Sequence, residues 1–241
     1  MELNGLTSHI SFPSGFDDVL DWTKPWTLGV DFYTLPDTAG ANNKASLFSS
    51  GGGHLTLHRQ GAPTGQNANW GSYNTCNNNL YNVTGRANAN TWYSPLPDSR
   101  VLYSFDPTTA KLQYFIGVKG GGWNRRANIS IPASFAGVQV VGPGLDFGLG
   151  FSGTGGANFS SVRWLGGVGD MVVSKHAWTD AMVTEYFAVA DKDFSALSFY
   201  VSFVWAWLRP GAYPEIVDVK GNVAAGSLVG GLAGDFKNVA P

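Results

Sequence analysis

The sequence predicts an all-β protein with the composition of a sandwich or a barrel. Of its 241 residues, 32 are glycine, 14% are aromatic and only 13% are charged, which is typical of many strands joined by turns. Several segments also alternate apolar and polar residues with the period of two that a strand requires. Apolar residues make up 44% of the chain, so the composition excludes an intrinsically disordered protein.

The first half of the chain contains three expected strands and one long polar segment. The clearest strand covers residues 26–33, whose apolar side chains share one face: Trp26, Leu28, Val30 and Phe32. Shorter alternations predict strands at residues 6–12 and 54–58. Residues 61–94 keep no apolar period, and a stretch of this length is expected to be functional or to carry short irregular strands.

The second half of the chain opens with an expected hairpin. Residues 100–105 and 112–116 alternate on either side of a turn at 106–109, where a proline is preset for the first central position. Shorter strands are expected after it, at residues 129–131, 145–151 and 169–174. These segments extend the all-β pattern along the chain.

One helix is expected to begin after Thr179. Threonine is a favourable N-cap residue, and Asp180 suits the positive end of the helix dipole. Two pairs spaced by four residues predict an apolar stripe: Met182 with Tyr186, and Val183 with Phe187.

Residues 197–207 form the second unusual stretch, a strict alternation without a charge. The pattern predicts a strand with one apolar face: Leu197, Phe199, Val201, Phe203, Trp205 and Trp207. Such a strand on an open edge would invite aggregation, so we expect it to pack on the domain's own sheet or on another subunit. The Gly- and Ala-rich segment after Pro210 cannot build a core alone and is expected to be flexible or docked on a partner.

Charge and cysteine content narrow the range of partners and compartments. The net charge is −2 and no basic run stands out, so nucleic-acid binding is not expected. The single cysteine, Cys76, excludes a disulfide framework within one chain and a CxxC zinc site. No secretory signal is visible at the N-terminus, and the longest charge-free apolar run is too short to span a bilayer. We expect synthesis in a cytoplasm and no membrane insertion.

Five segments follow one another in a characteristic order: NGLTSHISFPS, PWTLGVDFY, SLFSSGGGHLTLH, VLYSFDPTTAKLQYFIG and GDMVVSKHAWTDAMVTEYF. Together they resemble the laminin G-like, concanavalin A-like jelly roll. The last segment is the most specific, because a strand and a connector ending in Thr–Asp precede a short helix. The resemblance implies a two-sheet antiparallel jelly-roll sandwich over residues 1–191, with one short helix and a C-terminal extension.

The C-terminal segment, residues 192–241, combines an apolar strand, a Tyr–Pro pair, an acidic–Lys–Gly–Asn turn and a short tail. This order is similar to the closing segment of certain bacteriophage virion proteins that carry the jelly roll. The resemblance implies a structural protein of the capsid or tail, located in the virion, with other virion proteins as partners. The segment would then serve oligomerisation or anchoring, and we favour a homotrimer.

A glycanase is the enzyme that this fold class favours, but the carboxylates do not match one. Glycanases need two carboxylates at a fixed distance across a cleft, and the related glucanases carry Glu-x-Asp-x-x-Glu on one strand. The sequence has no such triplet, and the spacing of Glu215 and Asp218 would place them on opposite faces of a strand. We therefore expect no enzymatic activity, and the glycanase is kept as a less favoured alternative.

Metal ligands are left open by the sequence. His54 and His58 share one face of an expected strand, but two pleats separate them, which favours surface roles. Laminin G-like domains often bind calcium through Asp and backbone oxygens, and the candidates here are Asp31, Asp98, Asp106, Asp146 and Asp170. The alternative is that these aspartates accept hydrogen bonds from local backbone amides. No other cofactor is expected.

Aromatic side chains in the expected loops are the candidate glycan contacts. They lie among Asn, Gly and Arg residues: Trp70, Tyr73, Trp92, Tyr93 and Trp123, with Arg125. Exposed Trp and Tyr rings stack on sugar faces, whereas Asn and Arg bind hydroxyl groups. The alternative is that the rings cap the sheet or lie in a subunit interface. Adhesion to a host-surface glycan through these loops is one hypothesis beside the packing role, and a carbohydrate-binding module without a structural role is the alternative function.

Overall fold

The computed structural model describes residues 1–4, 8–16, 23–34, 44–50, 55–60, 69–76, 79–81, 99–130, 144–147, 165–190 and 193–231. Its strands are β1 (Glu2–Asn4), β2 (His9–Phe12), β3 (Trp26–Thr34), β4 (Lys44–Ser50), β5 (Leu55–Gln60), β6 (Asn69–Cys76), β7 (Asn79–Tyr81), β8 (Ser99–Asp106), β9 (Lys111–Val118), β10 (Trp123–Ser130), β11 (Leu145–Phe147), β12 (Leu165–Ser174), β13 (Ala206–Pro210), β14 (Glu215–Asp218) and β15 (Gly226–Val229). Its helices are α1 (Asp180–Ala188), the 3₁₀ turn η1 (Phe194–Ala196) and α2 (Tyr200–Phe203).

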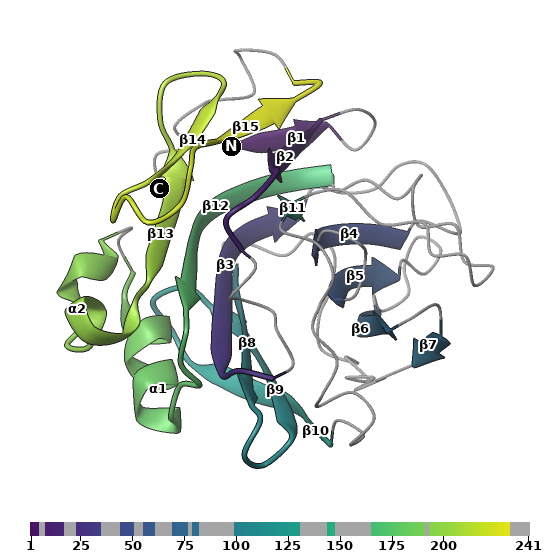
Figure 1. Cartoon of the computed structure of the whole chain (residues 1–241), viewed down its shortest axis with the longest axis vertical. Coiled ribbons are helices and arrows are strands. Elements are labelled where there is room, and N and C mark those ends of the chain that lie inside the picture. The colour runs from purple at the N-terminus through teal and green to yellow at the C-terminus, as the bar shows by residue number, and fades with distance from the viewer. Residues whose placement is uncertain are drawn as a thin grey trace.

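The strands form one continuous antiparallel path that folds over on itself (Figure 1). The hydrogen-bonded order is β10-β9-β8-β3-β12-β13-β14-β15-β2-β11-β4-β5-β6-β7, and β1 pairs with β12 beside this path. One apolar core joins residues of β3, β8, β9 and β12 to residues of β2, β11 and β15. The two halves of the path therefore face each other as a sandwich, and the predicted all-β jelly-roll fold is confirmed.

The alternating patterns place one face of each strand in this core. Ile10 and Phe12 of β2 are buried and the residues between them are partly exposed, as the period of two predicts. The predicted hairpin is confirmed as β8 and β9, with Asp106 opposite Lys111 at the turn. Strand β3 differs, because its second face is buried as well. That face lies under a second apolar cluster, to which α1 and η1 contribute buried residues.

The predicted helix is confirmed as α1. Thr179 is its N-cap, and its side chain accepts a hydrogen bond from the Met182 N–H. Val183, Tyr186 and Phe187 are buried, so the apolar stripe faces the sheet. Figure 1 shows α1 and α2 on one side of the molecule, with β4–β7 on the opposite side.

The strand predicted at 197–207 is wrong over most of its length. The chain forms η1, a turn and α2, and strand structure resumes only at Ala206. Side chains, rather than a neighbouring strand, satisfy backbone carbonyls in this region. The Lys220 ammonium donates to the carbonyls of Tyr200 at 3.1 Å and Val204 at 2.5 Å, and the Asn222 amide donates to Trp205 O at 2.7 Å. Contacts from a segment distant in sequence override the local alternation.

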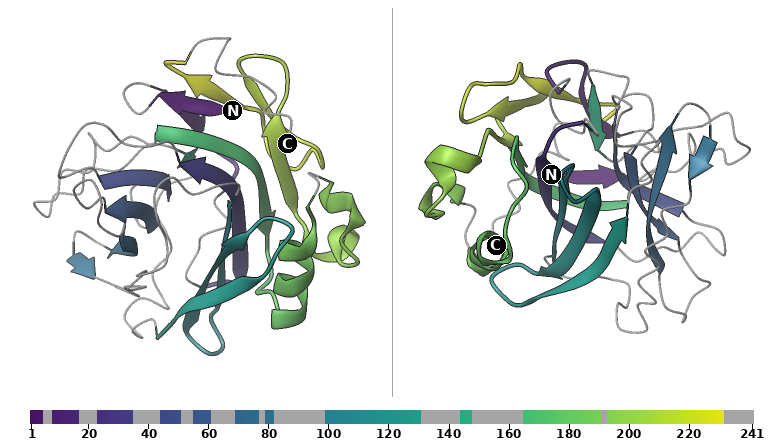
Figure 2. Two further views of the ribbon diagram at one scale, coloured as in Figure 1. Left: turned by 180° about the vertical axis from the view of Figure 1, so that it is seen from behind. Right: turned by 60° about the horizontal axis from the view of Figure 1, so that its bottom comes forward.

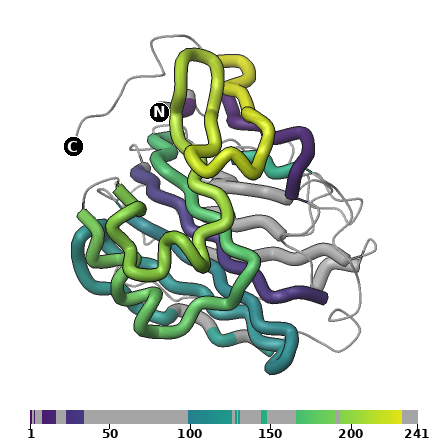
Figure 3. The backbone as a smooth tube through the Cα atoms, turned by 60° about the vertical axis from the view of Figure 1, so that its left-hand side comes forward, coloured from purple at the N-terminus to yellow at the C-terminus, as the bar shows by residue number. Residues whose placement is uncertain are grey.

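The residues after 206 extend the sandwich itself. β13 pairs with β12, β14 with β13, and β15 joins β14 to β2, so residues 206–229 link the two halves of the path. Figure 3 follows this course beside β12 and through the β14–β15 hairpin. Of the two alternatives left open for the apolar strand, the domain's own sheet or another subunit, Ala206–Pro210 takes the first by pairing with β12. None of the helices in the described ranges has the length and hydropathy needed to cross a membrane.

Candidate functional site

The β9–β10 hairpin carries a polar face at one end of the sheet path. Phe115 of β9 packs in the cluster under α1, whereas its neighbours Tyr114 and Ile116 face the sandwich core. Residues paired across two antiparallel strands point to the same side, so the register defines which residues share the outer face with Phe115. They are Lys111, Gln113, Trp123, Arg125, Asn128 and Ser130, and we call this surface the β9–β10 shelf.

A bulge in β10 keeps this face continuous. Arg125 pairs with Phe115 and Ala127 pairs with Tyr114, so one extra residue is inserted between them. Without it, Asn128 would fall on the core side of the strand. With it, Asn128 pairs with Gln113 and is exposed.

Trp123 is held in a fixed position at one end of the shelf. Its indole N–H donates to Thr184 Oγ1 of α1 at 3.1 Å, and its ring meets Phe115 edge to face at 5.1 Å. The ring nevertheless remains partly exposed. Its turn is tied to the same helix, because the Gly120 N–H donates to Phe187 O at 2.9 Å. In Figure 2 the teal hairpin accordingly lies beside the green helix.

Arg125 lies beside Trp123 and faces the start of α1. Its guanidinium pairs with the Asp180 carboxylate and lies 5.3 Å from the Phe115 ring centroid. The Arg125 side chain is 34% exposed, so several of its donors can reach a ligand. Asp180 therefore both begins the helix and orients the shelf's arginine.

The far end of the shelf is polar and is walled on one side. The Lys111 ammonium donates to Ser130 Oγ at 2.5 Å, and Asp106 of β8 lies directly across from Lys111. Next to Gln113 on β8 is Ser104, which is buried, and its hydroxyl accepts the Trp178 N–H at 2.9 Å. The segment before α1 thus bounds the shelf on the β8 side.

The structure separates the predicted glycan contacts. Trp123 and Arg125 are adjacent on β10, as described above. Trp70 and Tyr73 lie on β6, near the other end of the hydrogen-bonded path, and their side chains are outside the described part of the structure. Trp92 and Tyr93 lie outside the described residues altogether. The shelf residues that the sequence did not single out are Lys111, Gln113, Asn128 and Ser130. The alternation of residues 112–116 was the available signal for Gln113.

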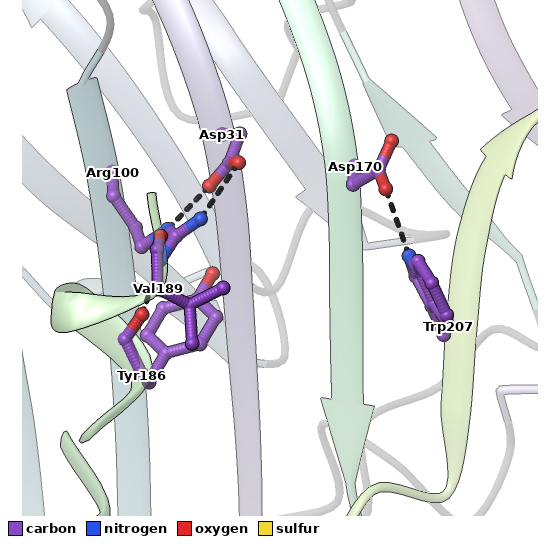
Figure 4. A network of polar contacts seen from close by, with 6 residues as sticks. All are labelled: Asp31, Arg100, Asp170, Tyr186, Val189 and Trp207. Atoms are coloured by element: carbon purple, nitrogen blue, oxygen red, sulfur yellow. Dashed lines mark hydrogen bonds and ion pairs between the residues drawn. The ribbon is translucent and has the colours of Figure 1, made fainter. Parts of the chain in front are cut away.

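Two of the predicted calcium ligands, Asp31 and Asp170, are buried and accept hydrogen bonds from other side chains (Figure 4). The Asp31 carboxylate accepts hydrogen bonds from Nε and Nη2 of Arg100, at 2.6 and 2.9 Å. Asp170 accepts the Trp207 indole N–H at 2.9 Å, with Arg209 at 3.9 Å. These contacts occupy carboxylate oxygens that a calcium ion would need.

The remaining calcium and histidine candidates that the structure describes are not brought together as ligands either. Asp106 accepts the backbone N–H of Thr108 at 2.9 Å, which is the turn role given as the alternative. Asp146 lies on β11, and Asp98 is outside the described residues. Of the histidines paired in the sequence, His58 lies on β5 and His54 is outside the described residues. Within the described ranges, no three His, Cys, Asp or Glu side chains gather as metal ligands.

Arg100 organises the buried polar network beneath α1. Besides Asp31, it donates to the carbonyls of Tyr186 and Val189 at the end of the helix, and its guanidinium lies 4.4 Å from the Tyr186 ring centroid. Burial alone would lower the pKa of Arg100, but the Asp31 carboxylate outweighs it and raises the pKa above its ordinary value. Burial raises the pKa of the Tyr186 hydroxyl well above its usual range. The network fixes the helix on which the shelf depends.

Most of the predicted subunit contacts are occupied within the chain. Leu197, Phe199 and Trp207 are buried in the cluster under α1, and Phe203 and Trp205 are partly buried. Val201 differs, with 86% of its surface exposed. The loss of strand alternation explains this division, because side chains on a short helix and turn do not share one face.

Comparison with known proteins identifies the fold but no family. No protein-family model and no curated protein matches the sequence. The fold is similar to that of a Bacteroides ovatus protein named for an inferred carbohydrate-binding role, with a TM-score of 0.51 and 12% identity over 95% of this chain. This chain spans 58% of that protein's length.

The native heptameric SAP-like pentraxin of Limulus polyphemus is similar with a TM-score of 0.52 and 13% identity, over 94% of this chain and 93% of the pentraxin. The match to a bacteriophage tailspike protein covers 79% of this chain and 28% of the tailspike, at 10% identity. Its TM-score of 0.48 is too low for the likeness to carry weight. At these identities the likeness shows the jelly-roll sandwich alone.

Proposed function

We propose that this jelly roll binds carbohydrate on the β9–β10 shelf and does not cleave it. The observation that carries the proposal is the fixed, partly exposed Trp123 ring beside Arg125 on an otherwise polar face. An indole ring offers an apolar surface to the C–H face of a sugar, and its position costs little entropy when the ring is already held. The inferred role of the similar Bacteroides ovatus protein supports this choice.

The polar side chains of the shelf supply the complementary contacts. Gln113 and Asn128 each carry amide donors and acceptors, and Arg125 adds charged donors, all within one face of two paired strands. Sugar recognition needs such a mixture of one apolar platform and a few oriented polar groups. Because these residues lie on two paired strands, the register sets the order in which the groups are presented.

A glycan array followed by calorimetry tests the proposal. Trp123→Ala should reduce the affinity for any bound glycan by about tenfold or more, the effect of roughly 1.4 kcal/mol. Tyr213→Ala is the matched control, because Tyr213 is also aromatic and is 46% exposed, but lies between β13 and β14. Equal losses in both variants, or no glycan bound by the intact chain, would refute the shelf as the site.

Binding without cleavage is favoured by the state of the carboxylates. Glu185 accepts hydrogen bonds from the Ser198 backbone N–H and hydroxyl. Asp218 accepts four backbone N–H groups, from Trp207, Lys220, Asn222 and Val223. Both are committed to structural contacts, whereas a glycosidase needs a free pair across a cleft. Release of new reducing ends from a bound polysaccharide would contradict this part of the proposal.

A structural role in a bacteriophage virion is the second candidate. It is favoured by the order of segments in residues 192–241 that resembles the end of virion proteins. We propose that the sandwich is displayed on the particle as a homo-oligomer, with a trimer favoured. Peptide mass spectrometry of purified particles and the mass of the protein in solution test this. A soluble monomer that no particle contains would overturn it.

A further inference from the structure

We infer that the ligand of the shelf is a linear, uncharged oligosaccharide that lies along the strands. The inference rests on the proposed glycan binding and adds the class of ligand. It depends on three properties of the shelf: its length, its boundaries and its balance of charge.

The shelf is long in one direction. Trp123 pairs with Gly117 and Ser130 pairs with Lys111, so the two ends are six residues apart along β9. At the rise of an antiparallel strand this is about 20 Å. A single sugar stacked on Trp123 would leave most of that length unused, whereas a chain of several units would reach the amides of Gln113 and Asn128.

The boundaries of the shelf suit an extended chain. On one side, Thr184 and Asp180 of α1 hold Trp123 and Arg125, and Trp178 covers Ser104 next to Gln113. On the other side, β10 is the last strand of the path in the described part of the chain. Among the described residues, a ligand that runs along β10 is therefore walled by α1 on the β9 side, where Phe115 is buried, and open on the other side, which admits a linear chain and its substituents there.

The charges on the shelf are balanced in pairs. Arg125 forms an ion pair with Asp180, and Lys111 lies across from Asp106, whose side chain points to the same face. Each of these two cations therefore has a carboxylate beside it, and the charges of these four groups sum to zero. An acidic glycan would gain little net attraction here and would meet two carboxylates, so the surface selects an uncharged chain that its hydrogen-bonding groups can recognise.

The test uses the full chain and a printed array of linear neutral glycans with their uronic-acid or sulfated counterparts. The neutral glycan bound best is then titrated as a series from disaccharide to hexasaccharide. Affinity should rise with length, and the dissociation constant should change by less than about twofold between low and high salt, because no net charge is screened. Asn128→Ala should weaken the hexasaccharide several-fold and leave the disaccharide unchanged, whereas Trp123→Ala should weaken both.

Each outcome separates this inference from the function on which it rests. Preferential binding of acidic glycans with a strong dependence on salt would overturn the inference while leaving glycan binding intact. A disaccharide that binds as tightly as the hexasaccharide would overturn the extended mode alone. If neither glycan class binds, the proposed function itself fails.

Discussion

Replacing Arg100 by methionine should lower the free energy of unfolding by about 3–5 kcal/mol, because the Asp31 carboxylate would stay buried without its partner. The Arg100 side chain is fully buried and that of Asp31 is 7% exposed, so water cannot replace the lost hydrogen bonds. The Tyr186 and Val189 carbonyls would lose a donor as well. Domains are stable by only about 5–15 kcal/mol, so this one change would remove a large part of the total.

Urea denaturation followed by tryptophan fluorescence measures this loss, and thermal melting should show a fall of about 10 °C or more for a chain of this size. Arg125→Met is the matched control. Its pair with Asp180 is solvent-exposed, and such pairs contribute about 0–1 kcal/mol. An Arg100→Met variant as stable as the Arg125→Met variant would refute the reasoning.

A second variant separates the cost of leaving the Asp31 charge unpaired from the cost of losing the packing of the guanidinium. Combining Arg100→Met with Asp31→Val removes both charges, and the double variant should be more stable than Arg100→Met alone by about 2 kcal/mol. If the double variant is instead less stable, the loss comes from packing of the guanidinium between the Tyr186 and Phe194 rings, which lie 4.4 and 5.0 Å away.

Four further changes test other contacts. Stability should fall as pH rises above about 10, because the Tyr186 hydroxyl ionises there in the unfolded chain, whereas its raised pKa keeps it neutral in the folded chain. In Tyr186→Phe this alkaline loss of stability should be smaller, as measured by denaturation from pH 7 to 11. Asp218→Asn should cost about 2–3 kcal/mol in urea denaturation, since an amide cannot accept four backbone N–H groups. Leu197→Ala should cost about 2–5 kcal/mol and Val201→Ala less than about 0.5, and comparable costs would contradict their different burial. Thr184→Val should weaken glycan binding about threefold to tenfold with unchanged stability, because it removes the acceptor of the Trp123 indole; unchanged calorimetric affinity would speak against a held ring.

The elements that the sequence predicted well are those whose signals are local. The alternation in β3, the turn between β8 and β9 and the cap at Thr179 each depend on residues within a few positions, and all three are confirmed. The run at 197–207 had an equally clear period and was misinterpreted. Its conformation is set by Lys220 and Asn222, which bind its carbonyls from 16 to 20 positions away in sequence.

The candidate site was predictable only in part for the same reason. Trp123 and Arg125 could be selected by residue type, but their partners Thr184 and Asp180 lie 61 and 55 positions further along the chain. The alternation of apolar and polar residues does not reveal the bulge that brings Asn128 to the same face. Residue type indicated the chemistry, while register and long-range contacts determined which residues share a surface.

Helix α1 connects the stability of the fold to the geometry of the shelf. Its first turns hold the shelf, through Asp180 with Arg125 and Thr184 with Trp123. Its last turn is held by Arg100, which binds the carbonyls of Tyr186 and Val189 from within the sheet. The buried ion pair with Asp31 therefore does more than satisfy two charges, because it fixes one end of the element that positions the other. The ring of Trp123 is thereby connected, through α1, to a buried polar network of the sheet.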